Sequence, residues 1–433
     1  TEDEGAYAAN DVYLTAPGGD QIESLQVGPT VTAFYQMKLE NDGNTARAFV
    51  LKASDGADAN WTFRYKIGAT DVTTAIRGPS GYATASLARG GSLVVTVEVT
   101  PDRLAAGGSS KSATVAAYLD GSDTTVRDLV QMVTTVDVVE QADLLVKLAG
   151  ESDDAYGLND VYQMAPSGDQ VEAQLAAEGV AAGYQIRVQN DGNMAARAFV
   201  LRAAEQSADG WAVVYRKADG TDISAQMRDP AGYTTGLLNQ GGVEVVNVSM
   251  TAGASVVGGA QVKSTVTVSF SGDPTVKDAV EISATLSVVT QADLLIKAAS
   301  QDDSAYAVAN TFQATPAGEQ VETVHVGPGV AASYRVKVAN VGNTSRSVVL
   351  KTAETSEAGW TLTYKVGDTD ISAGLRGEGY ATTLERGASE VIAVEMQPDP
   401  GVVGGTGKSA TLGVYYAAGD PAPTDSVQAV ALV

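Results

Sequence analysis

The side chains that most often do chemistry are scarce in this chain of 433 residues, and no set of them completes a catalytic centre. The single histidine, His325, stands in ETVHVGP, where apolar and polar residues alternate as in a strand, and there is no cysteine. These counts exclude thiol chemistry, a histidine metal cluster and a Ser-His-Asp triad in each of the three sequence repeats described below. The stretches GGSSK (107–111) and GGTGK (404–408) lack the spacing of a phosphate-binding loop. We expect a protein that is not an enzyme.

Acidic residues gather just ahead of a tyrosine that recurs along the chain, and calcium favours sites with several oxygen ligands. These groups are Glu2-Asp3-Glu4, Asp153-Asp154 and Asp302-Asp303. Short acidic runs are usually solvated surface, and no D-x-D-x-D-G loop is present. We therefore expect no cofactor, with calcium as the alternative at Asp153, Asp154, Asp302 and Asp303.

Charge and hydropathy exclude two classes of partner. Lys and Arg number 28 against 52 Asp and Glu, a formal charge of −24, so most of the surface would repel a phosphate backbone. No run approaches the roughly 18 apolar residues that a membrane-spanning helix needs. We expect neither nucleic-acid binding nor membrane insertion.

One stretch of sequence is written three times. The three tryptophans are Trp61, Trp211 and Trp360, and the asparagines that open a short turn are Asn41, Asn190 and Asn340. A period near 150 residues is that of a whole domain and too long for a solenoid unit. The sequence predicts three tandem modules over residues 1–140, 141–290 and 291–433.

Within each module the hydrophobic period is two. From Val180 to Val188 apolar residues alternate with mostly polar ones, as expected of a strand with one buried face. About seven such strands per module, glycine-rich turns and no convincing helix predict an all-β fold of antiparallel immunoglobulin-like sandwiches. We expect core positions at Trp61, Trp211, Trp360, Tyr35, Tyr184 and Tyr334. The turns N-D-G-N and N-V-G-N should use Gly43, Gly192 and Gly342 for a positive φ and need no ligand.

A tyrosine follows glycine at Tyr82, Tyr233 and Tyr380, in loops with the pattern G-Y-x-T. Exposed aromatic rings on loops are typical of glycan sites, which makes these three residues candidates. The favoured interpretation is that they cap the sandwich, because tyrosine commonly buries its ring and leaves its hydroxyl in water.

The joints between modules are short. Only residues 140–142 separate the end of one predicted module from DLLVKL, and residues 290–292 do the same before DLLIKA. Neither joint contains glycine or proline, so bending should be restricted. We expect an extended rod of at least about 110 Å.

The order Y-x-(V/I)-x-(V/L)-x-N-x-G-N, an apolar strand, G/N-W, L-x-x-G-(G/A) and V-x-V-x-(V/M)-x-P resembles immunoglobulin-like repeats of bacterial and archaeal surface proteins. These include the CARDB adhesion-related type and a module attached to some secreted glycoside hydrolases. The second module departs from the pattern, with Thr251-Ala252 in place of the proline. The resemblance implies an extracellular or cell-surface location and a spacer, adhesive or assembly role without catalysis.

Two functions follow as expectations. The first is a surface stalk or filament subunit that assembles end to end, and the second is a glycan-binding or adhesive accessory module. The second and third modules open with ADLLVKL and ADLLIKA, whereas no such strand precedes Tyr7 in the first. The uncovered sheet edge could recruit a strand from a neighbouring molecule, joining subunits head to tail.

Overall fold

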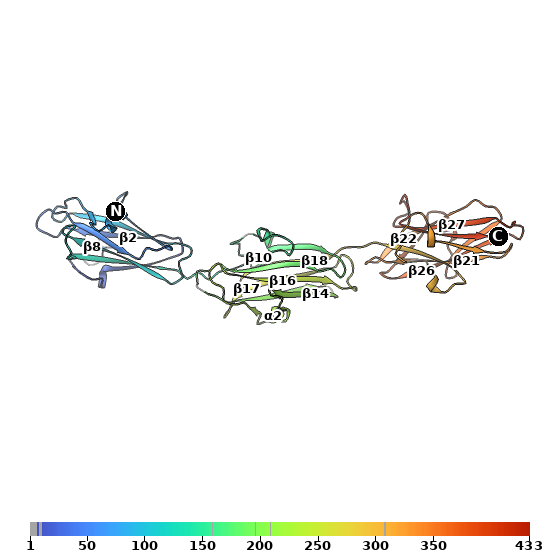
Figure 1. The fold of residues 1–433 in the computed structure, drawn as a ribbon, viewed down its shortest axis with the longest axis horizontal. Helices are drawn as coiled ribbons and strands as arrows, with labels where there is room; N and C mark the ends of the chain where they lie inside the picture. Colours follow the sequence, from blue (N-terminus) through green and yellow to red (C-terminus); the bar gives the residue numbers. More distant parts are fainter. Residues whose placement is uncertain (1–6, 8–10, 158, 195, 208, 307–308) are drawn as a thin grey trace.

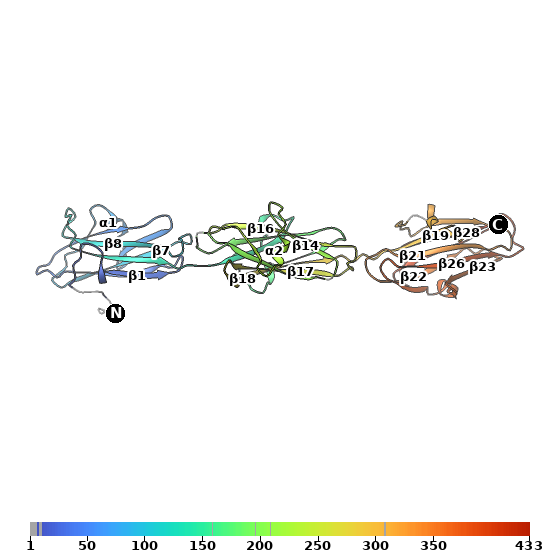
Figure 2. The same cartoon turned by 90° about the horizontal axis from the view of Figure 1, so that it is seen from below.

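The computed structural model describes residue 7 and residues 11–157, 159–194, 196–207, 209–306 and 309–433. Within them the chain forms six β-sheets and only short helices, which confirms the all-β class. Figure 1 shows the sheets grouped in three bodies along one long axis, and Figure 2 shows the same line after a quarter turn. The structure is therefore elongated and built from several domains.

The sheets come in pairs, with five and four strands in the first and second pairs and five and five in the third. In the first pair, the order in the five-stranded sheet is β1 (Ile22–Val27), β9 (Asp128–Val136), β8 (Ser110–Tyr118), β3 (Val50–Asp55) and β6 (Tyr82–Ala83). The order in its four-stranded sheet is β2 (Ala33–Glu40), β7 (Ser92–Pro101), β4 (Trp61–Ile67) and β5 (Thr70–Asp71).

The second pair repeats this plan, but its four-stranded sheet gains a strand at one edge and has no counterpart of β5 at the other. Its five-stranded sheet contains β11 (Val171–Ala176), β18 (Asp273–Leu286), β17 (Gln261–Phe270), β13 (Phe199–Ser207) and β15 (Tyr233–Thr234). Its four-stranded sheet contains β10 (Ala142–Leu148), β12 (Ala182–Asn190), β16 (Val243–Ala252) and β14 (Trp211–Lys217). The strand β10 is a new neighbour of β12.

The third pair follows the second. One of its sheets contains β20 (Val321–His325), β28 (Asp425–Leu432), β27 (Gly407–Tyr415), β22 (Arg346–Glu354) and β25 (Tyr380–Leu384). The other contains β19 (Ala292–Ala298), β21 (Ala332–Asn340), β26 (Ser389–Pro398), β23 (Trp360–Val366) and β24 (Thr369–Asp370). Here β19 takes the place that β10 has in the second pair.

The expectation of purely antiparallel sheets was wrong for one strand pair in each sheet pair. β1 runs parallel to β9, β11 to β18 and β20 to β28. In the second pair, residues 149–157 and 159–170 lie between β10, at the edge of one sheet, and β11, at the edge of the other, and end in the 3-10 turn Gly168–Gln170. The strand that follows therefore meets the last strand of its pair from the same end, and the two run in the same direction.

Three short helices were not expected from the sequence. They are α1 (Thr73–Arg77), α2 (Ser224–Arg228) and α3 (Ser372–Arg376), each of five residues. An aspartate two residues ahead, such as Asp370, accepts a hydrogen bond from the first helical N–H, that of Ser372, at 2.8 Å. A helix this short gives no 3.6-residue hydrophobic period to detect.

The core of each pair is one cluster of apolar side chains drawn from both sheets. On β12, Ala182, Tyr184, Ile186 and Val188 are buried and the residues between them are half-buried, which is the alternation that the sequence carries. Tyr35 and Tyr334 are buried at the corresponding places in β2 and β21.

The tryptophans differ in burial. Trp61 is buried, whereas Trp211 and Trp360 are half-buried and pack against the edge of their clusters. Each is the first residue of its strand, near the end of the sheet, and the fully buried aromatic four residues later is Tyr65, Tyr215 or Tyr364. Each core thus contains a fully buried tyrosine that the sequence analysis did not select, in addition to Tyr35, Tyr184 and Tyr334, which it did.

We expect Tyr215→Ala to destabilise the second sheet pair by about 3–5 kcal/mol, because it leaves a cavity around a fully buried ring. Trp211→Ala should cost less, because that ring already meets solvent. Urea unfolding followed by circular dichroism measures both variants. A larger loss for Trp211→Ala would place the centre of the core at the tryptophan.

Candidate functional site

The junction between the first and second sheet pairs is held by one asparagine side chain. Asn193 accepts a hydrogen bond at Oδ1 from Val139 N at 2.8 Å and donates through Nδ2 to Asp137 O at 2.7 Å. Its own backbone N–H donates to Val139 O at 3.1 Å, and its carbonyl accepts from Gly107 N at 2.8 Å. We call Asn193 with these partners the first asparagine clasp. It ties the connecting chain and a loop of the first pair to the second.

The second junction repeats the first bond for bond. Asn343 accepts from Val289 N at 2.8 Å and donates through Nδ2 to Ser287 O at 2.8 Å. Its N–H donates to Val289 O at 3.0 Å and its carbonyl accepts from Gly258 N at 3.0 Å. This second asparagine clasp shows that the geometry is a property of the repeat.

The glycine that directly precedes each clasp asparagine leaves space for the connecting chain and does not take a positive φ. Gly43, Gly192 and Gly342 are all absent from the residues with positive φ, contrary to the expectation for a tight hairpin. A Cβ on Gly192 would lie 2.5 Å from Val139 O and 3.1 Å from Gln141 N. Glycine is needed here because the connecting chain passes directly against it. Gly43, in the first pair, would meet only its neighbour Asn41, at 3.0 Å.

Charged side chains reinforce both junctions. Glu140 in the connecting chain forms an ion pair with Arg197 of the second pair. Across the second junction, Arg386 donates to Val256 O at 2.6 Å and pairs with Glu178 at 2.9 Å. Ion pairs between partly exposed groups contribute little by themselves, so the clasps carry most of the specificity.

A second repeated feature is an aspartate in the last strand of each pair, which is fully buried in the second and third pairs. In β18, Asp278 accepts at Oδ1 from Gln163 N, Gln170 Nε2 and Ala279 N, all at 2.8 Å. Its Oδ2 accepts from Leu144 N of β10 at 2.7 Å. Asp425 has the same arrangement, with Leu294 N of β19 at 2.6 Å from Oδ2. The carboxylate thus joins the first strand, the crossing segment and the last strand.

The sequence analysis missed both the clasp asparagines and these aspartates. The available signal was their recurrence, since Asn44, Asn193 and Asn343 hold one place in the repeat and Asp128, Asp278 and Asp425 another. Recurrence alone does not identify the backbone groups that they bind, because those lie in other segments.

Next to Asp278 lies a second buried carboxyl group, Asp143 of β10. Burial, with Asp191 and Asp278 nearby, raises the pKa of Asp143 to about 7. Its Oδ2 accepts from Asp160 N at 3.0 Å, while Oδ1 has no hydrogen-bond partner among the described residues. Burial also raises the pKa of Asp293, its counterpart in β19.

The calcium candidates differ in the charged and polar groups that they contact. Asp153 pairs with Lys147 at 3.2 Å and Asp303 with Lys297 at 3.1 Å, and both aspartates are highly exposed. Asp302 accepts a hydrogen bond from Ser304, which lowers its pKa, and Asp154 is exposed. Among the residues with described placement, no group of three His, Asp or Glu could hold a metal ion. Glu2, Asp3 and Glu4 lie outside those residues.

The glycan candidates are half-buried. The rings of Tyr82, Tyr233 and Tyr380 pack against the core cluster of their own sheet pair. Tyr233 donates to Glu244 at 2.5 Å and Tyr380 to Glu390 at 3.4 Å. Burial and the neighbouring carboxylate raise the pKa of both hydroxyls. The positions suit side chains that cap the core.

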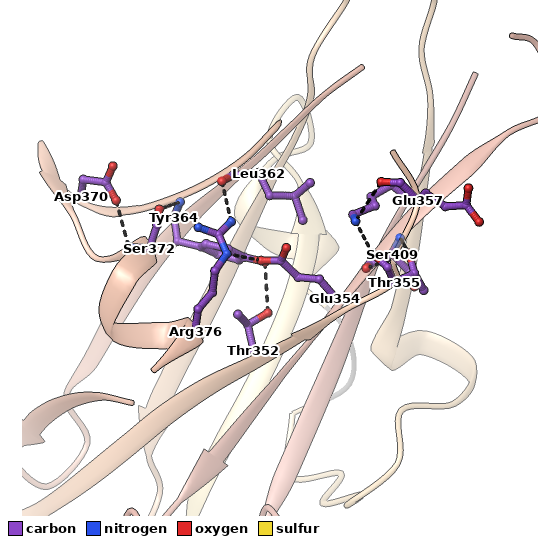
Figure 3. A network of polar contacts seen from close by, with 11 residues as sticks. Thr352, Glu354, Thr355, Glu357, Leu362, Tyr364, Asp370, Ser372, Arg376 and Ser409 are labelled. Atoms are coloured by element: carbon purple, nitrogen blue, oxygen red, sulfur yellow. Dashed lines mark hydrogen bonds and ion pairs between the residues drawn. The ribbon is translucent and has the colours of Figure 1, made fainter. Parts of the chain in front are cut away.

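One cluster has the residue types of an acid–base site, and Figure 3 shows it in the third pair. Glu354 pairs with Arg376 of α3 at 2.7 Å and accepts from Tyr364 OH at 3.0 Å, while Arg376 also donates to Leu362 O at 2.7 Å. Burial raises the pKa of Tyr364, so its hydroxyl keeps its proton at neutral pH. With the carboxylate neutralised by arginine, the arrangement fastens the short helix to the core.

No protein-family model and no curated protein sequence matches the chain. Among solved structures, the CupB6 tip adhesin from Pseudomonas aeruginosa is 7% identical, with 68% of this chain and 99% of that one covered and a TM-score of 0.33. The C-terminal domain of the AgI/II polypeptide BspA from Streptococcus agalactiae is 14% identical, covering 60% and 96%, with a TM-score of 0.20. The endo-fucoidan hydrolase MfFcnA4 of glycoside hydrolase family 107 is 14% identical, covering 95% and 43%, with a TM-score of 0.18. TM-scores this low assign neither a fold family nor an activity.

Removing the clasp should loosen the first junction. We expect Asn193→Ala to broaden the distance distribution between spin labels on the first and second sheet pairs, measured by pulsed electron paramagnetic resonance. Asn44→Ala is the matched control, because Asn44 is exposed and has no hydrogen-bond partner among the described residues. Equal distributions for both variants would mean that the clasp does not restrict the junction.

The buried carboxyl of Asp143 should make the second pair less stable as pH rises. Because its folded-state pKa lies above the value of about 3.9 in an unfolded chain, the folded chain holds a proton that the unfolded chain has lost between those two values. The contribution of this group to stability is therefore greatest below about pH 4 and is lost as pH rises toward about 7.

Asp143→Asn should flatten this dependence. Urea midpoints at pH 5 and pH 8, read from Trp211 fluorescence in a Trp61→Phe, Trp360→Phe background, measure it. Asp209→Asn, an exposed change of the same charge, is the control and should keep the slope. An unchanged slope in Asp143→Asn would assign the titration to another group.

Proposed function

We propose that the chain is a non-catalytic structural protein of the cell surface or extracellular space, a stalk or filament subunit whose domains are stacked end to end. In this proposal each sheet pair is an immunoglobulin-like sandwich of the CARDB-like type. The three tandem modules cover residues 1–140, 141–290 and 291–433, and the described residues of the first contain no counterpart of β10.

The observation that carries the proposal is the pair of asparagine clasps. Two junctions that differ in sequence around them use the same four hydrogen bonds, and both clasp asparagines are almost fully buried, 2% exposed for Asn193 and 5% for Asn343. A flexible tether would have no need of this geometry. A protein that keeps fixed angles between domains is suited to span distance, which is the task of a stalk.

Head-to-tail self-association extends the same idea. Loops equivalent to the two halves of a clasp occur at opposite ends of the described structure, with Asn44 in the first pair and Gly404 in the third. A second copy could bring these two together in the arrangement that Asn193 and Gly107 already adopt.

The alternative function is a glycan-binding or adhesive accessory module. It is less well supported, because the hydroxyls of Tyr233 and Tyr380 are already engaged by glutamates and the rings of Tyr82, Tyr233 and Tyr380 lean on the core.

Small-angle scattering tests the stalk. We expect a maximum dimension of at least about 110 Å for the monomer, from three domains of roughly 40 Å in line. We propose that no cofactor is needed, so the curve should be the same in calcium and after chelation with EDTA. A compact particle would contradict the stalk, and shortening or bending on chelation would establish a structural calcium ion.

A further inference from the structure

The first strand of the second and third sheet pairs is buried on both faces. β10 pairs antiparallel with β12 from Ala142 opposite Asn190 to Leu148 opposite Tyr184, and β19 pairs with β21 in the same register. Between Ala142 and Val146 every residue of β10 is at most 1% exposed. This strand completes the core, because Ala142, Leu144 and Val146 belong to its main cluster.

The first sheet pair has the same site, and no described residue occupies it as a strand. Within the described part of the chain, β2 pairs with β7 along one side and with no strand along the other. Leu39 of β2 and Val130 of β9 are only partly buried, whereas their counterparts Val188 and Val280 are fully buried. Phe34 of β2 is 62% exposed. An unpaired edge beside uncovered apolar side chains is a place where a strand can add.

The polar groups that hold β10 are also in place. Asp128 of β9 accepts at Oδ1 from Leu14 N, Gln21 Nε2 and Leu129 N at 2.8–2.9 Å, as Asp278 does from its counterparts. Its Oδ2, which in Asp278 accepts from Leu144 N, has no donor among the described residues. The carboxylate is therefore oriented toward an N–H that residues 11–433 do not supply.

The segment ahead of β1, which corresponds to the crossing segment of the other pairs, also has a group that could bind a first strand. Asp11 has φ 58°, close to the 64° of Asp160 and the 63° of Asn310. The N–H of Asp160 donates to Asp143 and that of Asn310 to Asp293, both in the first strand. No described residue accepts from the N–H of Asp11. The backbone at Asp11 already has the conformation that binds an aspartate of an incoming strand.

A clasp asparagine completes the set. Asn44 holds the place of Asn193, but it is exposed and bonds to no described residue. In the other two pairs this residue binds the chain just ahead of the first strand, Asp137–Val139 and Ser287–Val289. Four elements of the first pair could thus bind a single segment: the β2 edge, Asp128, Asp11 and Asn44. We call them together the strand receptor.

We propose that the strand receptor binds an extended segment with the pattern V-V-x-Q-A-D-L-L-(V/I)-K that is supplied from outside residues 1–433. The segment runs antiparallel to β2, with its alanine opposite Asn41 and the residue after its lysine opposite Tyr35. Its second valine binds Asn44, its aspartate accepts from Asp11 N, and the leucine that follows donates to Asp128 Oδ2. Its alternate apolar side chains close the core over Leu39 and Val130.

The donor comes from outside residues 1–433 because both matching segments in this chain are already used. Residues 142–148 and 292–298 are almost fully buried in their own sheets, and withdrawing either would leave Asp278 or Asp425 without its Oδ2 donor. A buried carboxylate that loses a donor is costly. Exchange between folded copies is therefore unfavourable compared with the addition of a free segment.

The binding test uses the whole chain and a labelled peptide of residues 137–150, DVVEQADLLVKLAG. Fluorescence anisotropy should show saturable binding of one peptide per chain. A peptide carrying Leu144→Pro lacks the N–H that faces Asp128 and should bind about tenfold more weakly or worse. Asp128→Asn in the protein should weaken binding similarly, because an amide donor then faces the incoming N–H. Asp368→Asn, an exposed change of equal charge in the third pair, is the control.

Disulfide trapping tests the register, and the absence of natural cysteines makes it clean. In the second pair a Cβ on Gly183 would lie 3.0 Å from that of Ala149. Phe34 corresponds to Gly183, so Phe34→Cys should crosslink to a peptide with Ala149→Cys and not to one with Leu145→Cys, four residues away. Equal trapping of both peptides, no saturable binding, or binding indifferent to Leu144→Pro would overturn the proposal.

This inference deepens the proposed function by naming what the first sheet pair accepts, and the two can fail separately. If peptide binds in register but native chains stay single at all concentrations, the receptor stands and head-to-tail assembly falls. If chains polymerise and saturating peptide does not shorten the polymers, assembly stands and the receptor is not its contact.

Discussion

A carboxylate that leaves water must find hydrogen-bond donors, and Asp278 and Asp425 are fully buried in the last strand of their sheet pairs. Each obtains four donors from three segments distant in sequence: its own strand, the crossing segment and the first strand. Two sheets packed through apolar side chains alone could slide, whereas this group accepts one relative placement. The strand order, the crossing to the parallel partner strand and the closure of the core all depend on it.

At each junction, likewise, one polar side chain forms hydrogen bonds with several backbone groups. Asn193 and Asn343 satisfy N–H and C=O groups of the connecting chain that could not all reach each other, and the neighbouring glycines leave space for that chain to pass. Since the first strand begins directly after the clasp, the direction in which it enters the sheet is fixed by the junction. Domain stacking and domain folding are therefore parts of one structure.

The all-β class and most strand positions could be predicted from the sequence, because the two-residue period of segments such as Val180–Val188 directly reflects one buried face. The parallel pairs could not, since direction depends on a crossing segment with no regular period. Gly192 was assigned the wrong reason: a positive φ is a local property, whereas its actual need comes from Val139, over 50 residues away in the chain. Asn193 and Asp278 were missed likewise, because their partners are backbone groups that carry no residue identity.

Identical residues in a repeat need not have identical tasks. Asn44 and Asn193 share their sequence context, yet one is exposed and the other buried, and the same holds in lesser degree for Asp128 and Asp278. The difference lies in the neighbour. Where the described residues supply a connecting chain and a first strand, these residues are structural; in the first pair, where the described residues supply neither, the same atoms make up the strand receptor. Repetition thus supplies the strand receptor without additional sequence, because the groups that hold β10 and β19 in register in the other pairs are also suited to hold an added strand.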